Sequence, residues 1–566
     1  MWKEISQGQK MMLNIKNKEG GVETDRKKIV SVATEFYKQL YGRDKMDGQG
    51  REEALAEDHE GEEVPSVLVW EVEDELKKLK VGKAPGPDNI DNKILKDFRE
   101  ILAKLLEELF NLILEKEEIP KQWEVAEIML IYKKGKRNNI ENYRPISLTS
   151  NVCKIFMKIM KNRLYNQLDL QQPEEQAGFR RNYETIDHIH TINQVIEKAK
   201  EYKLDLYMMF VDYKKAFDLV KHKKIWESLS NQGVPRKLVR IIKNVYKEAK
   251  AYLKMEGKKG PIFRIWNGVK QGDPMSSSIF NSVLEEVFRK LDWERKGVNI
   301  GGCFLSNLRF ADDIVLMSTR KEELREMATD LIRESKKGGL EWNMKKTKIM
   351  KIRQEDEIGE GGGLEIEGEL IEEVSEYVYL GQTVSAKEGQ EREIKVRRNK
   401  AWGKFWSLQK VFRGGLSNKG KLKILESCVM PVLTYGAETW ATTKKHVNDI
   451  QKTQREMVRI ILGVKRKERV SNEELRRRAN VIDIGFSIKI KKFKYAGHVV
   501  RGKVQRWARK AMEWIPYNGR RGRGRPRVRW EDEIKNRVGV AWERMVWNRA
   551  IWRKIGEAYA QEWVAC

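Results

Sequence analysis

Cysteine is scarce and scattered in this chain of 566 residues. The four cysteines, Cys153, Cys303, Cys428 and Cys566, lie far apart in the sequence. This spacing supports neither a disulfide framework nor a CxxC zinc site, and it fits a reducing compartment.

Long apolar runs are missing as well. No stretch approaches the roughly 18 apolar residues of a membrane span, and the opening MWKEISQGQK lacks the apolar core of a signal peptide. The sequence therefore predicts an intracellular protein that has no membrane partner, and we expect it in the nucleus and cytoplasm.

Positive charge is what the chain has in excess. It carries 112 Lys and Arg against 84 Asp and Glu, a formal net charge of +28. Residues 401–566 hold 39 Lys and Arg against 15 Asp and Glu, so the first 400 residues are close to neutral. A basic end on a near-neutral body predicts a polyanionic partner, most often nucleic acid, and a solvated basic tail is the alternative.

The pattern of the chain divides it into four predicted parts. Residues 1–80 contain a helical extension and an acidic linker. Residues 81–385 alternate irregularly between strand-like and helical segments, which favours an α+β domain over a regular βαβ array. Residues 386–480 are mostly helical, and residues 481–566 are basic and rich in Trp and Arg.

Three carboxylates interrupt apolar strand-like runs. Asp212 ends the run DLYMMFVD, and Asp312 with Asp313 divides LRFADDIVLM, where a strand, a tight turn and a second strand fit. If these strands are neighbours in one sheet, the three carboxylates converge at its end, where hard cations such as Mg²⁺ find oxygen ligands. Two such ions about 4 Å apart would serve phosphoryl transfer. A solvent-exposed turn is the alternative for ADD taken alone.

An ordered series of motifs surrounds these carboxylates. GKAPGPDNI (82–90), YRPISLTS (143–150), FVDYKKAFDLV (210–220), GVKQGDPMSSSIFN (268–281) and YVYLGQTVS (377–385) follow one another. The series resembles the reverse transcriptases of non-LTR, LINE-type retrotransposons over roughly residues 82–465. Downstream, LTYGAETWATT, AGHVVR and GRGRPRVRWEDEI look most like the RTE-like subgroup.

The resemblance implies a fold and an activity. The fold is a right-hand polymerase: fingers and a ferredoxin-like palm in 81–385, a helical thumb in 386–480, and a nucleic-acid-binding region in 481–566. The activity is RNA-directed DNA polymerisation, a nucleotidyl transfer that uses an RNA template, a DNA primer or target, dNTPs and two Mg²⁺ ions. The chain begins too close to the fingers to include the endonuclease of full-length elements, so we expect that activity to come from elsewhere.

The resemblance also assigns roles to residues of this sequence. Asp212, Asp312 and Asp313 would bind the metal ions, and Lys346 would protonate the departing pyrophosphate. The nucleotide would lie against Lys133, Arg144, Phe217, Gln271 and Gly272. For Phe217 the alternative is plain core packing, and for the lysines and Arg144 it is a solvated surface position.

Two departures from the family pattern stand beside Gln271 and Gly272. Asp273 follows where a small residue or Cys is common, and PMSSS replaces P-L-S-P. An extra carboxylate near the nucleotide could weaken dNTP binding. The second hypothesis is therefore a retrotransposon remnant that only binds nucleic acid, and a maturase or telomerase-like enzyme, which shares the palm, is a third.

The basic end holds two further features. Ten of the 17 tryptophans lie between 402 and 563, mostly at helical spacing, which favours small helical cores over base-stacking surfaces. The segment RRGRGRPRVR resembles an AT-hook, and its arginines are predicted to contact nucleic acid: Arg520, Arg521, Arg523, Arg525, Arg527 and Arg529. His498 has no Cys or His partner at zinc spacing and is predicted to be structural or a hydrogen bonder.

Overall fold

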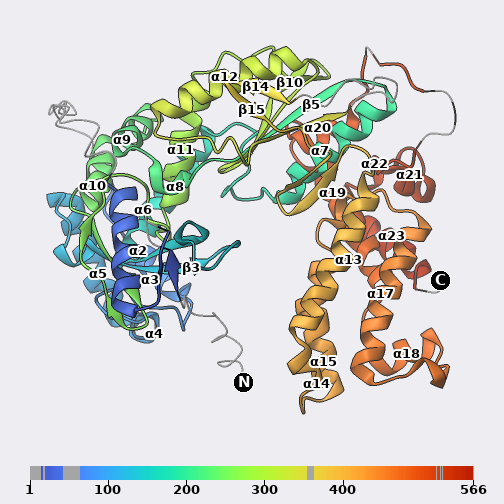
Figure 1. Ribbon diagram of the computed structural model, residues 1–566, viewed down its shortest axis with the longest axis horizontal. Coiled ribbons are helices and arrows are strands. Elements are labelled where there is room, and N and C mark those ends of the chain that lie inside the picture. The colour runs from blue at the N-terminus through green and yellow to red at the C-terminus, as the bar shows by residue number, and fades with distance from the viewer. Residues whose placement is uncertain are drawn as a thin grey trace. The chain divides into compact units, whose positions relative to one another are not determined.

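The computed structural model describes residues 14–16, 20–42, 64–352, 363–517, 519–522, 524 and 527–564. It separates into two compact units. Unit 1 takes the described parts of 1–173 with 213–292 and 331–342, and unit 2 takes 174–212, 293–330 and the described parts of 343–566. Figure 1 shows the elements of both units along the chain. The acidic linker and residues 353–362 lie outside the described residues.

Unit 1 combines helices with a five-stranded sheet of order β4-β3-β6-β7, in which β8 also pairs with β6. The strands of this sheet are β3 (Val125–Tyr132), β4 (Tyr143–Leu148), β6 (Lys250–Met255), β7 (Lys258–Lys259) and β8 (Phe263–Arg264). A separate two-stranded sheet consists of β1 (Ile15–Lys16) and β2 (Val22–Glu23). Its helices are α2 (Arg26–Leu40), α3 (Val69–Lys77), α4 (Asn92–Asp97), α5 (Arg99–Lys116), α6 (Asn151–Leu170), α8 (Ala216–Leu219), α9 (His222–Asn231), α10 (Arg236–Lys247) and α11 (Ser276–Phe288).

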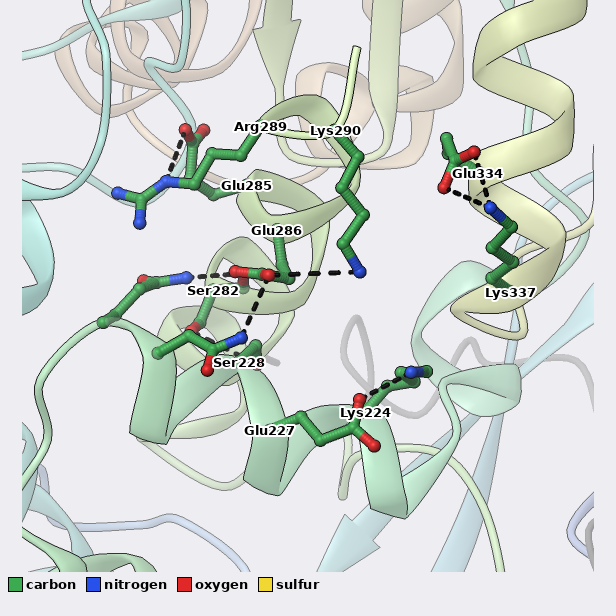
Figure 2. Close-up of polar contacts among 12 residues, drawn as sticks. Lys224, Glu227, Ser228, Ser282, Glu285, Glu286, Arg289, Lys290, Glu334 and Lys337 are labelled. Carbon is green, nitrogen blue, oxygen red and sulfur yellow. Dashed lines mark hydrogen bonds and ion pairs between the residues drawn. The ribbon is translucent and has the colours of Figure 1, made fainter.

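Polar contacts fasten α9 to α11 within unit 1. Figure 2 shows Ser228 of α9 facing Ser282 of α11, with the two hydroxyl oxygens 3.4 Å apart. The Gln232 amide donates to the Ser282 carbonyl over 2.8 Å, and the Asn231 amide donates to Glu286 over 3.0 Å. Glu334 and Lys337 form a separate ion pair at 2.7 Å near the end of α12 (Lys321–Lys337). The contacts between α9 and α11 position α11, whose first turn follows the QGDPM loop.

Unit 2 contains a four-stranded sheet of order β11-β12-β5-β13. The strands are β11 (Asn307–Phe310), β12 (Asp313–Ser318), β5 (Leu206–Val211) and β13 (Lys348–Ile352), and the pairs β11–β12, β12–β5 and β13–β5 are antiparallel. All six residues of β5 are buried, which explains its uninterrupted apolar sequence. Short hairpins form from β9 (Val298–Ile300) with β10 (Cys303–Leu305), β14 (Leu364–Ile366) with β15 (Glu369–Ile371), and β16 (Glu376–Tyr379) with β17 (Gln382–Ser385).

One face of this sheet packs on α7 (Thr185–Glu201). Alternate β5 residues, Leu206, Met208 and Phe210, share a buried cluster with Ile192 and Val195 of α7. This alternation follows from the two-residue period of a strand. A one-residue shift in the pairing of β5 would move these apolar side chains to the other face of the sheet, so their burial fixes the register. Helices and mixed sheets together confirm the α+β class predicted from the sequence.

The rest of unit 2 is helical. The helices are α13 (Gln390–Ser407), α14 (Gln409–Arg413), α15 (Asn418–Ile424), α16 (Met430–Leu433), α17 (Lys444–Leu462), α18 (Asn472–Ala479), α19 (Ile484–Arg501), α20 (Trp507–Glu513), α21 (Asp532–Val538), α22 (Trp542–Met545) and α23 (Arg549–Glu562). Local signals delimit α17: Thr443 caps its N-terminus, and Gly463 ends it at φ +72°. No helix in the described part of the chain is long and apolar enough to cross a membrane.

Most tryptophans of the basic end pack inside these helices, as the helical spacing predicts. Trp406 and Trp547 are exposed, whereas the following six are buried: Trp440, Trp507, Trp514, Trp530, Trp542 and Trp552. Trp530, Trp542 and Trp552 form one core with Phe493 and Tyr495 of α19. The C-terminal region is therefore a packed helical structure with a basic surface.

A buried ionic group ties α19 to α21. Lys489 and Lys492 are fully buried, and both amines contact the Glu533 carboxylate, at 2.6 and 2.9 Å. Thr442 accepts a hydrogen bond from Lys489, and the Trp440 carbonyl accepts one from Lys492. Burial alone would raise the pKa of Glu533, but Lys492 and Lys489 outweigh it and lower this pKa to about 2.

Replacing Glu533 by Gln should destabilise this region strongly, because two buried cations lose their only counter-charge in the group. We expect a loss of about 3–5 kcal/mol in the free energy of unfolding. Because the folded pKa of Glu533 lies below its usual value of 4.5, wild-type stability should also fall as pH drops from about 4.5 toward 2, and the variant should lack this component.

Denaturant unfolding at several pH values measures both effects. The matched control is Glu562→Gln, which removes an exposed pairing with Arg537 and should change stability by less than about 1 kcal/mol. Equal losses in the two variants would contradict the role of the buried group.

Candidate active site

Asp212 stands where the central strand β5 ends. Its backbone N–H donates to the Thr347 hydroxyl over 3.3 Å, and its carbonyl accepts from the Asn343 N–H over 2.7 Å. Both partners belong to the loop that leads into β13, the neighbour of β5. The segment containing Asn343 and Thr347 therefore fixes the backbone of Asp212 from one side.

Asp312 and Asp313 occupy the hairpin between β11 and β12. Phe310 pairs with Asp313, which leaves Ala311 and Asp312 as a two-residue turn. Ala311 has a φ of +58°, the sign that a type II′ hairpin turn requires at its first central residue. Asp312 is half-buried and Asp313 is exposed. The predicted strand, turn and strand are confirmed.

Strand pairing aligns this turn with Asp212. The last β5 residue, Val211, pairs with Ile314 of β12. Because the strands are antiparallel, the next pair of positions consists of Asp212, after Val211, and Asp313, before Ile314. The phenol of Tyr377 interacts electrostatically with the carboxylates of both Asp212 and Asp313. Burial raises the pKa of Tyr377 to about 12, and the Asp212 and Asp313 carboxylates add to this rise. The prediction that the two carboxylate-bearing strands are neighbours in one sheet is confirmed.

A segment before α7 supports the hairpin turn. Gln176 is fully buried, and its side-chain carbonyl accepts hydrogen bonds from the N–H groups of Gly178, at 2.9 Å, and Ala311, at 3.1 Å. The Ala177 N–H donates to the Arg309 carbonyl, and the Arg309 N–H donates to the Glu175 carbonyl. A Cβ on Gly178 would lie 2.3 Å from the Ala311 nitrogen, so only glycine fits beside the turn.

The donor chemistry at Asp212 suits a hard cation. Its Oδ2 atom is buried and accepts no hydrogen bond, and the Lys346 amine lies 3.6 Å away. A buried carboxylate oxygen without a hydrogen bond needs a positive partner, which Lys346 supplies in part. Within the described residues, no group of three or more His, Cys, Asp or Glu side chains is arranged to hold a metal ion by itself. The metal roles of Asp212, Asp312 and Asp313 stay predictions.

Lys346 lies in the tight turn ahead of β13. Its backbone N–H donates to the Asn343 carbonyl, and its side chain is 59 % exposed. The amine is therefore both solvated and close to Asp212, which distinguishes it from an ordinary surface lysine.

The residues predicted to meet the nucleotide belong to unit 1. The Ser147 N–H donates to the Gln271 carbonyl over 2.7 Å, and Gly272 has a φ of +114°. A Cβ on Gly272 would lie 2.8 Å from the Ser147 carbonyl oxygen, so this loop needs glycine to approach β4. Arg144 is exposed on the same strand, and Lys133 is exposed just after β3. The structure thus brings Gln271, Gly272 and Arg144 onto and beside one strand.

Phe217 and Asp273 are placed by packing. Phe217 is half-buried and stacks on Phe280 at 4.3 Å between ring centres. Asp273 is 7 % exposed, and its carboxylate accepts from the Met275 N–H at the start of α11. Burial raises the pKa of Asp273, while Lys270, Lys154 and Lys161 oppose the rise. The departure QGD therefore places its carboxylate in the buried turn that precedes α11.

The arginine segment is partly engaged by the protein itself. Arg521 pairs with Glu201 of α7 at 2.9 Å, and Arg529 pairs with Asp532 at 2.9 Å and with Glu201 at 3.5 Å. Arg520 and Arg527 are exposed, and Arg523 and Arg525 lie outside the described residues. His498 lies 3.6 Å from Asp187 of α7, a structural contact that agrees with its prediction.

Comparison with known proteins identifies the family. The sequence model of the family described as reverse transcriptase (RNA-dependent DNA polymerase) matches residues 131–384. A transposon-derived protein of Caenorhabditis elegans is 32 % identical over 245 residues, which cover 43 % of this chain and 88 % of the worm protein. The chain belongs to the reverse transcriptase family. All three acidic positions and every predicted nucleotide-binding position lie inside the matched range.

Further relatives connect this reverse transcriptase to non-LTR mobile elements. The RNA-directed DNA polymerase of the mobile element jockey from Drosophila melanogaster is 28 % identical over 70 % of this chain. The Pol polyprotein of the type-1 retrotransposable element R2 from Nasonia vitripennis is 30 % identical over 44 %. The chain covers 44 % of the jockey protein and 24 % of the R2 protein. The RTE-like subgroup and the separate endonuclease stay predictions.

Among solved structures, apo telomerase from Candida tropicalis is similar over 73 % of this chain and 69 % of its own. The sequence identity is 15 % and the TM-score is 0.37.

Sequence reasoning missed the residues that hold the reverse transcriptase carboxylates in place. Gln176 and Gly178 belong to QAGFRR, and nothing in this segment predicts contact with a turn that lies 135 residues after Gln176. Thr347 stands in NMKKTK beside Lys346, and only the pairing of β13 with β5 brings it to Asp212. None of these contacts has a signal in local spacing.

Gly178→Ala should displace the carboxylate turn, because the added methyl group meets backbone rather than a flexible side chain. We expect a stability loss of about 1–3 kcal/mol. The matched control is Gly403→Ala in α13, where nothing lies within 4 Å of the new Cβ and the helix should gain about 0.5–1 kcal/mol. Thermal unfolding of both variants tests this, and an unchanged Gly178→Ala protein would contradict the close approach.

Proposed function

We propose that the chain is an RNA-directed DNA polymerase of a non-LTR retrotransposon, which extends a DNA 3′-OH along an RNA template. The observation that carries the proposal is the pairing of β12 with β5, which aligns the Asp312–Asp313 turn with Asp212. Family membership supports the reaction class and a nucleic-acid template. The dNTP substrates, the magnesium ions, a nuclease from elsewhere and a nuclear and cytoplasmic location belong to the same proposal.

In this reaction, the primer 3′-oxygen forms a bond to the α-phosphorus of a dNTP while the bond to pyrophosphate breaks. Magnesium ions, when bound, lower the pKa of the attacking hydroxyl and neutralise charge on the leaving oxygens. Asp212 and Asp312 would hold these ions, with Asp313 in support. Asp212 is suited to this because its Oδ2 atom has no other hydrogen-bond partner.

Other side chains of the chain bind and orient the substrates. Arg144 offers a bidentate fork to the triphosphate, and Lys133 offers a point charge. The Phe217 ring, held by Phe280, would face the sugar and disfavour a 2′-OH. Lys346 would give a proton to the departing pyrophosphate as general acid. Its side chain is 59 % exposed, so the amine can exchange protons with water between turnovers.

The arginines of the C-terminal region are proposed to contact phosphates. Among the described arginines of this segment, Arg520, Arg521 and Arg527 are exposed. Binding through them should weaken as salt rises, because condensed counterions are released on binding. Arg521 and Arg529 would have to exchange their Glu201 contact for phosphate.

Asp312→Asn should abolish extension of a DNA primer on an RNA template in the presence of Mg²⁺. We expect a fall of at least about a hundredfold, since the amide has no charge to hold a metal ion. The matched control is Asp205→Asn, an exposed carboxylate at the opposite end of β5 that should retain wild-type extension.

Three results separate the hypotheses. Extension by wild type and control but not by Asp312→Asn supports the polymerase. Equal extension by all three proteins contradicts the metal assignment. RNA binding without extension in all three favours the remnant that only binds nucleic acid.

Lys346→Ala should slow nucleotide addition by about a hundredfold or more if this amine is the general acid. The matched control is Lys345→Ala, because Lys345 is an exposed neighbour with the same charge. Single-turnover primer extension across pH 6–10 measures both the rate and its alkaline decline. An unchanged rate, or an equal loss in the two variants, would contradict the role of Lys346.

A further inference from the structure

The N-terminal helix α2 is built into the core of unit 1. Its buried residues follow helical spacing, and Tyr37 is fully buried. Tyr37 and the helix-ending Tyr41 share a core with strand residues that include Ile128, Ala251 and Phe263. The Tyr37 hydroxyl donates to the Tyr143 carbonyl over 3.3 Å, which ties α2 to β4.

A buried carboxylate connects α2 to the Gln271 loop. Asp218 is 2 % exposed, and its Oδ1 atom accepts hydrogen bonds from the Tyr41 hydroxyl, at 3.1 Å, and from the Gln271 amide, at 2.8 Å. An ionised carboxylate only accepts, so Asp218 determines which end of the Gln271 amide faces it. The amide nitrogen is thereby directed to Asp218, and the amide oxygen is directed away.

Hydrogen bonds to backbone carbonyls, the first two from the Asn267 side chain, reinforce this connection. The Asn267 amide donates to the Leu40 carbonyl over 3.1 Å and to the Asp218 carbonyl over 2.7 Å. The Trp266 N–H donates to the Tyr41 carbonyl over 2.8 Å. A Cβ on Gly268 would lie 2.5 Å from the Asp218 carbonyl oxygen, so the loop needs glycine there. The end of α2 thus contacts both the segment after β5 and the segment that leads to Gln271.

Lys215, the residue that precedes α8, makes a further contact with α2. Its amine lies over the rings of Phe36, at 4.4 Å, and Tyr37, at 5.2 Å. Lys215 has a φ of +43°, an unfavourable backbone conformation that the cation–π contacts help to maintain. Helix α2 therefore contacts the KKAFD segment at both Lys215 and Asp218.

We infer that Tyr41 and Asp218 are positioning residues for Gln271: the N-terminal helix orients the amide that meets the incoming nucleotide. This inference rests on the proposed function, in which Gln271 lines the nucleotide site. Tyr41 and Asp218 would act through Gln271 and not by touching the substrate. Burial raises the pKa of Asp218 to about 6, while Lys215, Gln271 and Tyr41 oppose the rise, so the carboxylate is ionised and accepting at neutral pH.

Tyr41→Phe tests the inference, because it removes one hydroxyl from a buried ring of the same shape. We expect the KM for dNTP to rise about three- to tenfold, the effect of one lost hydrogen bond, with little change in kcat. The matched control is Tyr37→Phe on the same helix, whose hydroxyl contacts Tyr143 and not Asp218. This control should leave the KM unchanged.

A double-mutant cycle separates positioning from general damage. In a Gln271→Ala background, Tyr41→Phe should have no further effect on KM, because the amide through which it acts is gone. An additive effect, or a KM that Tyr41→Phe leaves unchanged in the wild-type background, would overturn the inference.

Hydrogen exchange decides the inference independently of activity. In the substrate-free protein, Tyr41→Phe should increase amide exchange in residues 266–274 at least threefold more than Tyr37→Phe does. Equal exchange in the two variants would overturn the positioning role. A wild-type protein that extends no primer would instead contradict the proposed function, and the exchange result would still stand.

Discussion

The pairing of β12 with β5 is the constraint on which the candidate site depends. It places two acidic positions, Asp212 and Asp313, side by side where buried strands end, with Asp312 in the adjoining turn. Like charges at such close range repel, and a buried carboxylate oxygen without a partner is unfavourable. Lys346 places its amine 3.6 Å from Asp212 and offsets part of this cost. Divalent cations are the partners that reverse transcriptases use.

Several neighbouring residues hold the backbone of the hairpin turn and of Asp212 in place. Gln176 and Gly178 support the turn from one side, and Thr347 with Asn343 supports Asp212 from the other. These supporting contacts to Ala311 and Asp212 go to backbone groups, so they fix the chain without using the carboxylates. Unit 1 follows the same principle at Gln271 and Gly272, whose backbone is fixed by Ser147 while the Gln271 amide is oriented by Asp218.

The sequence predicted the strands and the turn because their signals are local. Six apolar residues before Asp212 indicate a buried strand, and ADD between apolar runs indicates a hairpin. Which strands pair stayed a condition of the sequence-based argument, since two-residue periodicity cannot choose between neighbours. Local spacing also could not reveal Gln176 or Asp218, because their contacts cross 135 and 177 residues of sequence. Asp273 shows the converse: its position beside Gln271 in sequence suggested contact with the nucleotide, whereas burial makes it part of the fold.

The central claim is that Asp212 and Asp312 hold the same metal ions. Anomalous diffraction from crystals of the protein soaked with Mn²⁺ and a non-hydrolysable dNTP analogue tests it most directly. The account predicts manganese peaks within about 2.0–2.3 Å of carboxylate oxygens from both residues, and their loss in Asp212→Asn crystals. Manganese bound elsewhere, or bound to one of the two carboxylates and unaffected by removal of the other, would contradict it.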